Sequence, residues 1–179
     1  MREHLTLSDR LRVATRAAHT EAERGPMMQR LLSGHLPLAD YCGLLRQLQA
    51  IYAALENALS EQIGDPQVAR VCPSTLWRSA ALAEDLTYLG TREQPLVSGL
   101  LAAATLAYVS RLQQLALHDP LCLLAHAYVR YLGDLYGGQM LGQRLRQQHG
   151  LTEGRGTRFY EFGDAAQVKA LIVEFRAAL

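Results

Sequence analysis

Apolar residues recur at intervals of three and four along most of this chain, which is the period of an α-helix. Only Arg158–Phe162 suggests extended chain, and it is too short to define a sheet. Glycine and proline interrupt the helical pattern, and these breaks predict helices at about 5–24, 38–63, 74–89, 96–117, 120–149 and 164–179. The pattern therefore predicts an all-α fold, a compact single-domain helical bundle of about seven helices.

Residues that favour helix ends stand at the predicted boundaries. Thr6–Asp9 has a capping-box pattern at the start of the first helix, and Gly25 with Pro26 closes it. Asp119 is a good N-cap for the helix at 120–149, and Gly150 supplies its stop. Asp164 is expected to cap the last helix.

The composition indicates a soluble intracellular protein. With 179 residues and a formal charge of +1, the chain can bury a core and has no general attraction for nucleic acid or acidic membranes. No segment resembles a signal peptide or is apolar and long enough to span a bilayer. Three cysteines without metal-like spacing are expected to be buried, reduced thiols: Cys42, Cys72 and Cys122. We expect a cytoplasmic monomer.

The predicted helix at 120–149 carries four glycines in its middle, at Gly133, Gly137, Gly138 and Gly142. Each costs about 1 kcal/mol relative to alanine, so the four together cost about 4 kcal/mol. That is a large loss for a domain with a net stability of about 5–15 kcal/mol. The glycines either let another helix cross closely, or let the backbone bend and lie flat against a large planar molecule. Asp134, with Arg130 one turn before it, favours the second explanation, because a dry crossing gains little from a buried carboxylate.

The first predicted helix has a polar stripe in which Arg12, Arg16, His19 and Glu23 follow at intervals of four, three and four. A row of charges is usually a solvated face, and a single histidine on a helix is more often structural or exposed than a ligand. Small residues around His19, however, leave room for a bulky group beside its imidazole: Ala17, Ala18 and Ala22. Glu23 is placed to accept a hydrogen bond from the ring and to fix its tautomer as a metal ligand.

One bound molecule would account for the unusual residues of both helices. One offers an axial imidazole and cations, and the other offers a close-packed glycine backbone with a carboxylate. A flat, iron-bearing molecule with carboxylates on its edge fits between them, and that description is of haem. Haem is therefore expected to be sandwiched between the first helix and a kinked, glycine-rich helix.

The run His126–Gln139 closely resembles the signature of the haem oxygenases. Ala14–Glu23, Ile51–Glu56 and Ala80–Leu86 are similar to pieces of the same family in the same order, so the likeness covers nearly the whole chain. The resemblance is to bacterial members similar to the animal enzymes, and it implies O2-dependent opening of haem to biliverdin, carbon monoxide and Fe2+. Haem would be both substrate and cofactor. Electrons would come from an external donor, a ferredoxin or a flavoprotein reductase, because no flavin or nicotinamide motif is present.

The resemblance also implies roles for individual residues. His19 would be the proximal iron ligand, held by Glu23, with Met28 packing near the haem. Asp134 would hold the distal water network that supplies protons, with Tyr52 and Arg130 as further members. The distal wall would be formed by Gly133, Gly137 and Gly138. The propionates would be met by Arg12, Arg16, Tyr128 and Arg176.

Three departures from the family pattern stand out. Tyr136 replaces a common serine, so a large side chain either points away from the haem or crowds it. Ile172 replaces a frequent lysine one turn before Arg176, and Lys169 is a partial substitute for it. The family also usually continues through another helix beyond Leu179.

Two alternative functions use the same fold. One is a non-catalytic haem carrier or sensor, and the other is an all-α bundle with a small-molecule site and no haem. Asp134 favours the enzyme over the carrier, because a carrier does not need a carboxylate to organise distal water. His126 lies roughly 10 Å along the helix from Gly133, too far to be a second axial ligand. The other histidines are expected at the surface, namely His4, His35, His118 and His149, and Trp77 in the core.

Overall fold

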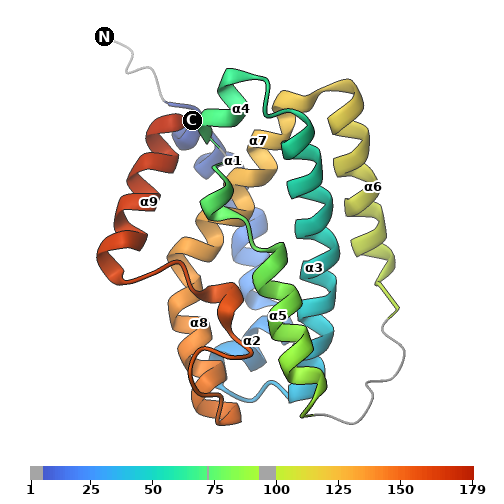
Figure 1. Cartoon of the computed structure of the whole chain (residues 1–179), viewed down its shortest axis with the longest axis vertical. Helices are drawn as coiled ribbons and strands as arrows, with labels where there is room; N and C mark the ends of the chain where they lie inside the picture. Colours follow the sequence, from blue (N-terminus) through green and yellow to red (C-terminus); the bar gives the residue numbers. More distant parts are fainter. Residues whose placement is uncertain (1–5, 72, 93–99) are drawn as a thin grey trace.

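The computed structural model describes residues 6–71, 73–92 and 100–179, and this part of the chain is helical without β-strands (Figure 1). Its helices are α1 (Leu7–Arg24), α2 (Pro26–Ser33), α3 (Leu38–Glu61), α4 (Pro66–Val71), α5 (Ser79–Gly90), α6 (Ala103–His118), α7 (Leu123–Ala127), α8 (Gly133–His149) and α9 (Ala165–Ala178). Since α7 and α8 belong to one continuous rod, the described residues form eight helices, one more than expected. The predicted ranges do not include the short helices α2 and α4, the second of which follows the predicted stop after α3. The all-α prediction is confirmed.

Helix α3 forms the centre of the bundle. It packs against α6 and α5, and Figure 1 shows these three helices as neighbouring rods on one side, with α8 and α9 on the other. Its buried face carries the apolar residues that the sequence pattern selects, among them Tyr41, Leu45, Leu48, Tyr52, Leu55 and Leu59. The hydrophobic core therefore includes the face of α3 that packs against the glycine-bearing rod.

The glycine-bearing rod is not one regular helix. It begins with a 3-10 turn, η2 (Pro120–Cys122), continues as α7, passes through a π-helical segment, η3 (Tyr128–Leu132), and ends as α8. Asp119 marks its start, but no side-chain bond caps the backbone there. The carboxylate of Asp119 instead accepts a hydrogen bond from Cys122 Sγ at 3.0 Å. The irregularity thus lies just before Gly133, not at the glycines themselves.

Two predicted elements begin or fold differently because buried carboxylates bind their backbone. The predicted helix at 74–89 is a 3-10 turn, η1 (Ser74–Leu76), followed by α5, whose first amides at Arg78 and Ser79 donate to Glu56 of α3 at 2.5 and 3.1 Å. The expected extended segment Arg158–Phe162 contains a 3-10 turn, η4 (Arg158–Tyr160), whose first two amides donate to Asp85. The helix predicted at 96–117 begins at Ala103, and its expected start lies outside the described residues.

Other local predictions have mixed outcomes. Thr6 and Asp164 cap their helices as expected, the second in a full capping box, and Gly150 ends α8 with a positive φ. Cys42 is buried, but Cys122 is exposed, because its short turn lies at the surface. Cys72 and His4 lie outside the described residues. His35 and His118 are exposed as expected, and Trp77 is half-buried against the core.

His149 corrects one surface prediction. It is half-buried, and its ring stacks on Tyr41 with the ring centroids 6.5 Å apart. The end of α8 is thereby packed against the start of α3.

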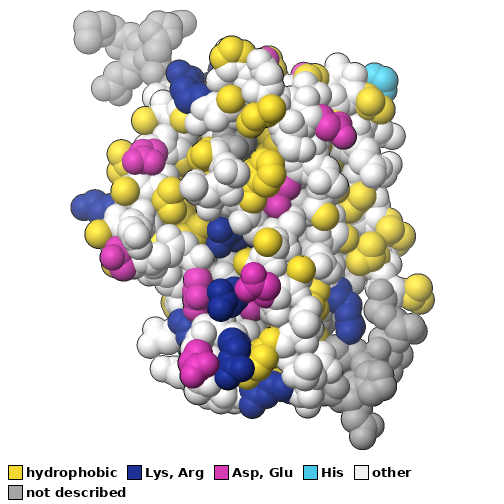
Figure 2. Space-filling model, in the orientation of Figure 1, with side chains coloured by type: hydrophobic (Ala, Val, Ile, Leu, Met, Phe, Trp, Pro, Cys, Tyr) yellow, Lys and Arg dark blue, Asp and Glu magenta, His cyan; other side chains and the backbone are white. Residues whose placement is uncertain are grey.

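The outer surface mixes charges of both signs. Figure 2 shows acidic and basic side chains interspersed on the visible face, in keeping with the net charge of +1. Exposed ion pairs such as Arg158–Glu84 and Arg146–Glu161 contribute to this mixture. Among the described helices, none combines the length and the apolar character that crossing a membrane requires.

Candidate functional site

The glycines of the long rod face two directions. A methyl group on Gly133 or Gly137 would have no other atom within 4 Å beyond its chain neighbours and its own helix backbone, so these positions border open space. A methyl group on Gly138 or Gly142 would lie 3.3 or 3.0 Å from the side chain of Tyr160 in η4. Close packing by another segment therefore accounts for the second pair, whereas the first pair leaves room for a ligand.

Beside the open glycines, Asp134, Tyr52 and Arg130 form a connected group. The Tyr52 hydroxyl donates a hydrogen bond to Asp134 Oδ2, and Arg130 Nε donates to the same hydroxyl at 3.3 Å. The guanidinium of Arg130 also lies over the Tyr52 ring, 5.1 Å from its centroid. Tyr52 has no exposed surface, so α3 holds the two polar groups of the rod from inside the bundle. The structure brings these three predicted residues together.

The group is arranged to hold a proton near neutral pH. Burial raises the pKa of Asp134 from 3.8 to about 6, although Arg130 and the Tyr52 hydrogen bond act in the opposite direction. Burial and the neighbouring Asp134 raise the pKa of Tyr52 well above its ordinary value, so the tyrosine stays a donor. Burial opposes the charge of Arg130, but Tyr52 and Asp134 outweigh it and raise the pKa. A carboxyl that titrates near the working pH is suited to proton transfer.

We expect the free energy of unfolding to fall as the pH rises from about 4 to about 7. Asp134 and Asp85 both have a pKa raised to about 6 by burial, so the folded chain binds protons more readily than the unfolded chain in this range. Their contribution is fully present below pH 3.8 and is lost as the pH rises through about 6, on the order of 3 kcal/mol per group. Urea unfolding at a series of pH values measures this slope.

Asp85→Asn is the matched variant for that measurement. Its amide stays neutral, so the pH dependence should be shallower than in the unaltered chain, even though the variant is less stable because the amide cannot accept from both backbone N–H groups of Arg158 and Phe159. Identical slopes for the two proteins would contradict the assignment.

Helix α1 exposes its polar stripe. The side chain of His19 is 67% exposed, and Glu23 Oε2 lies 3.6 Å from its Nδ1, which leaves Nε2 as the nitrogen available to a metal. The helix packs against α2 and against η3, the segment that leads into Gly133. The stripe and the open glycines are thus on elements that adjoin each other.

Two of the predicted anion-binding arginines meet at one carboxylate. Arg12 Nη2 lies 3.8 Å from Asp9 Oδ1, and Arg176 Nη2 of α9 lies 3.4 Å from the same oxygen. Asp9 therefore brings α1 and the end of α9 together. Its pKa is lowered, first by the hydrogen bond from Thr6 and then by the two arginines, with burial acting against them.

The remaining predicted residues surround this region. Met28 is half-buried against the core, and Tyr128 is buried in η3 with 9% of its surface exposed. Tyr136 is 62% exposed, and its side chain does not come within 4 Å of a methyl group placed on Gly133. Ile172 packs against the core rather than extending a charge toward solvent.

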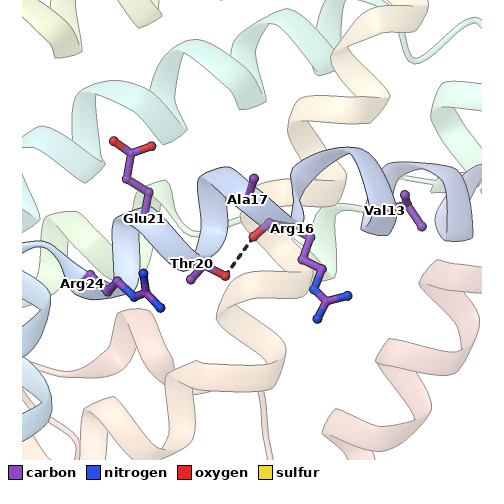
Figure 3. A pocket seen from close by; sticks show the side chains of 6 residues that line it. All are labelled: Val13, Arg16, Ala17, Thr20, Glu21 and Arg24. Atoms are coloured by element: carbon purple, nitrogen blue, oxygen red, sulfur yellow. Dashed lines mark hydrogen bonds between the residues drawn. The ribbon is translucent and has the colours of Figure 1, made fainter.

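A shallow hollow of about 580 Å³ lies along α1 (Figure 3). It is lined by Val13, Arg16, Ala17, Thr20, Glu21 and Arg24, all from the same helix. These positions follow helical spacing that omits His19. Of the candidate residues, the hollow includes Arg16 alone.

Three important residues were not singled out from the sequence, namely Glu56, Asp85 and Tyr160. Each acts through a partner that is distant in the chain: Glu56 on the start of α5, Asp85 on η4 and Tyr160 on the glycines of α8. A signal was present, since Glu56 and Asp85 are acidic residues at the buried positions of otherwise amphipathic helices.

Comparison with known proteins yields one family. A family model described as heme oxygenase matches residues 5–179. Heme oxygenase 1 from Nostoc sp. is 36% identical over 176 residues, which cover 97% of this chain and 72% of that protein. Heme oxygenase 2 from Synechocystis sp. is 38% identical over 172 residues, covering 92% and 68%. The crystal structure of heme oxygenase-1 from Synechocystis sp. in complex with heme matches with a TM-score of 0.87 at 33% identity, covering 97% of this chain and 78% of that one.

Proposed function

Because this chain belongs to the heme oxygenase family, we propose that haem binds between α1 and the open glycine face of α8 and is opened there. As a member of that family the protein is an oxidoreductase that uses O2 and electrons to convert haem to biliverdin, carbon monoxide and Fe2+. The observation that carries the location is the pairing of an exposed imidazole on α1 with two glycines that border open space on the adjoining rod.

The residues present suit haem as a substrate. Gly133 and Gly137 expose backbone without side chains, which allows a flat ring to approach the helix closely. His19 supplies a nitrogen ligand, and Glu23 is positioned at the other ring nitrogen to hold the imidazole in one tautomer. Met28 adds apolar contact beside it. An imidazole ligand, unlike a thiolate, does not strongly favour O–O cleavage, which suits attack on the ring itself.

The carboxylate edge of haem faces the cations near Asp9. Arg12 and Arg176 already share that carboxylate, and a propionate replaces or supplements it as their partner. Arg16 and Tyr128 complete the set. Because these contacts are made at one edge of the ring, they determine which part of the macrocycle lies over the catalytic group.

Asp134, Tyr52 and Arg130 supply the protons that the reaction consumes. The carboxyl of Asp134 orders water beside the open glycines and exchanges protons with it near neutral pH. Tyr52 holds that carboxyl in place by donating a hydrogen bond to it, and Arg130 in turn donates to the Tyr52 hydroxyl. Gly138 supports this wall from behind, where its lack of a side chain lets Tyr160 pack against α8.

Gly137→Ala should stabilise the ligand-free chain by up to about 1 kcal/mol, because alanine favours the helix and nothing obstructs its methyl group. The same methyl group should lower haem affinity about tenfold by holding the ring away from the backbone. Gly142→Ala should instead destabilise the fold by about 1–2 kcal/mol, because its methyl group would meet Tyr160. Thermal unfolding and hemin titration measure both effects, and equal behaviour of the two variants would contradict the two-faced helix.

Other aspects of the function follow from the same proposal. We infer that residues 1–179 act as one domain, as a monomer in the cytoplasm, and that a ferredoxin or a flavoprotein reductase supplies the electrons. Neither nucleic acid nor a membrane is expected as a partner.

One experiment tests the activity. The protein is mixed with one equivalent of hemin, a reducing system and oxygen, and the pigment is identified by its absorption spectrum and by chromatography. Formation of biliverdin is the expected outcome. A stable haem complex that yields no pigment under turnover conditions would favour the carrier alternative. Failure to bind hemin at one equivalent would contradict both the enzyme and the carrier.

A further inference from the structure

The π-helical segment η3 determines which way the catalytic face of α8 points. A π-turn accommodates one more residue than an α-turn, and each residue of an α-helix rotates the chain by about 100°. If Tyr128–Leu132 were regular α-helix, Gly133 and Asp134 would face a different side of the rod. The interactions that hold this segment in its register therefore set the direction of the open glycines and of Asp134.

Two side-chain hydrogen bonds tie η3 to α3. Arg130 Nε donates to the Tyr52 hydroxyl, and Tyr131 Oη donates to Glu56 Oε1. The donor–acceptor distance is 3.3 Å in both bonds. Tyr52 and Glu56 are four residues apart on α3, so they lie on one face one turn from each other. Consecutive residues of η3 are thus held by consecutive turns of α3.

Glu56 is a rigid acceptor for this purpose. It is 4% exposed, and it also accepts from the backbone N–H groups of Arg78 and Ser79 and from the Ser79 hydroxyl. These three donors from the start of α5 fix the carboxylate without help from η3. Tyr131 then binds to a group that is already held in place, so its hydrogen bond constrains η3 and not Glu56.

Tyr131 also contacts the residue that holds Asp134. Its side chain is fully buried, and its ring centroid lies 6.0 Å from that of Tyr52 and 6.3 Å from that of Phe175. A change in the position of Tyr131 is therefore transmitted to Tyr52, whose hydroxyl donates to Asp134. Helix α9 supports the ring from the other side through Phe175.

We propose that Tyr131 is a positioning residue, and that its hydrogen bond to Glu56 keeps η3 in the π register that aims Asp134 and the open glycines at the haem. The proposal rests on the function given above, because the direction of Asp134 matters only if haem lies on that side of α8. Neither residue touches haem. Their effect passes through the rotation of the rod and through the Tyr52 ring.

Tyr131→Phe tests the proposal, since it removes the hydroxyl and keeps the ring packing. In the ligand-free protein, hydrogen–deuterium exchange of 128–138 should become about tenfold faster, the size expected for losing one hydrogen bond to a charged group. In the hemin complex, the pH at which the ferric absorption spectrum changes should shift by about 0.5 unit or more. The kcat should fall about tenfold, with less than a threefold change in the hemin Kd.

Tyr41→Phe is the control, because it removes the hydroxyl of another fully buried tyrosine, which donates to the Gly156 carbonyl and stacks on His149 of the same rod. It should change neither the exchange of 128–138 nor the spectral transition. Glu56→Gln should reproduce the effects of Tyr131→Phe in weaker form, and it keeps the test available if Tyr131→Phe does not fold.

A lower melting temperature of Tyr131→Phe with unchanged exchange in η3 and an unchanged spectral transition would overturn the proposal, because a merely structural role predicts that result. Failure of the unaltered protein to bind hemin would instead refute the proposed function. The exchange measurement on the ligand-free chain would then still decide whether Tyr131 holds the π register.

Discussion

Replacing His19 by alanine should abolish biliverdin formation, with a loss of at least about 1000-fold in rate, equivalent to about 4 kcal/mol. His19 is the exposed imidazole of α1 with Glu23 at its Nδ1, and no other described histidine lies on this stripe. On the proposed assignment, the iron then loses its protein ligand, and the haem is held only by ring packing and by propionate contacts. The absorption spectrum of the hemin complex should lose the features of histidine ligation, and hemin titration should show at least about tenfold weaker binding.

His35→Ala provides the comparison for this variant, because His35 is also exposed but lies in the turn after α2, away from the stripe. It should bind hemin and form biliverdin at the normal rate. An unchanged histidine spectrum in His19→Ala would remove the ligand assignment. Addition of imidazole should partly restore the spectrum of His19→Ala if the cavity left by the side chain is otherwise intact.

Asp134→Ala should slow biliverdin formation by about 100-fold or more and leave the hemin Kd within about threefold of its normal value. The carboxyl lies beside the open glycines but is bound by Tyr52, so its removal takes away the proposed proton source without removing a contact proposed to hold the ring. Oxygen should still be consumed, with the electrons diverted to peroxide. Pigment formation, oxygen uptake and peroxide release, measured together, separate these steps.

Asp40→Ala is a suitable comparison, because Asp40 is an exposed carboxylate at the start of α3 that pairs with Arg30 at the surface. It should change neither the rate nor the product. Asp134→Asn should resemble Asp134→Ala in turnover, because an amide keeps the size of the side chain but cannot exchange a proton near pH 6. Normal biliverdin formation by either Asp134 variant would show that the proton source is elsewhere.

The sequence predicted those parts of the fold that depend on local chemistry. Thr6, Asp164 and Gly150 mark helix ends because capping involves residues a few positions apart. The start of α5 and the turn η4 were mispredicted because their backbone N–H groups are bound by Glu56 and Asp85 from other helices. The pattern of a single segment contains no information about such distant acceptors.

In the candidate site too, contacts between residues close in the sequence were predictable from spacing, and contacts between distant residues were not. The proximity of His19 and Glu23 follows from their spacing of four on one helix. The contacts of Tyr52 with Asp134 join positions 82 residues apart, and only the resemblance to a family suggested them. The π-segment was not predicted, since five residues of ordinary helical character, Tyr128–Leu132, adopt it when their side chains are bound by α3.

The opposite orientation of the two glycine pairs in α8 has a consequence for protein engineering. Residues 133 and 137 can be substituted to narrow the opening and so exclude larger macrocycles without disturbing the interior, because nothing packs against them. Residues 138 and 142 do not offer that freedom, since the ring of Tyr160 occupies the adjoining volume. Libraries that seek altered tetrapyrrole preference should therefore vary the first pair and keep the second as glycine.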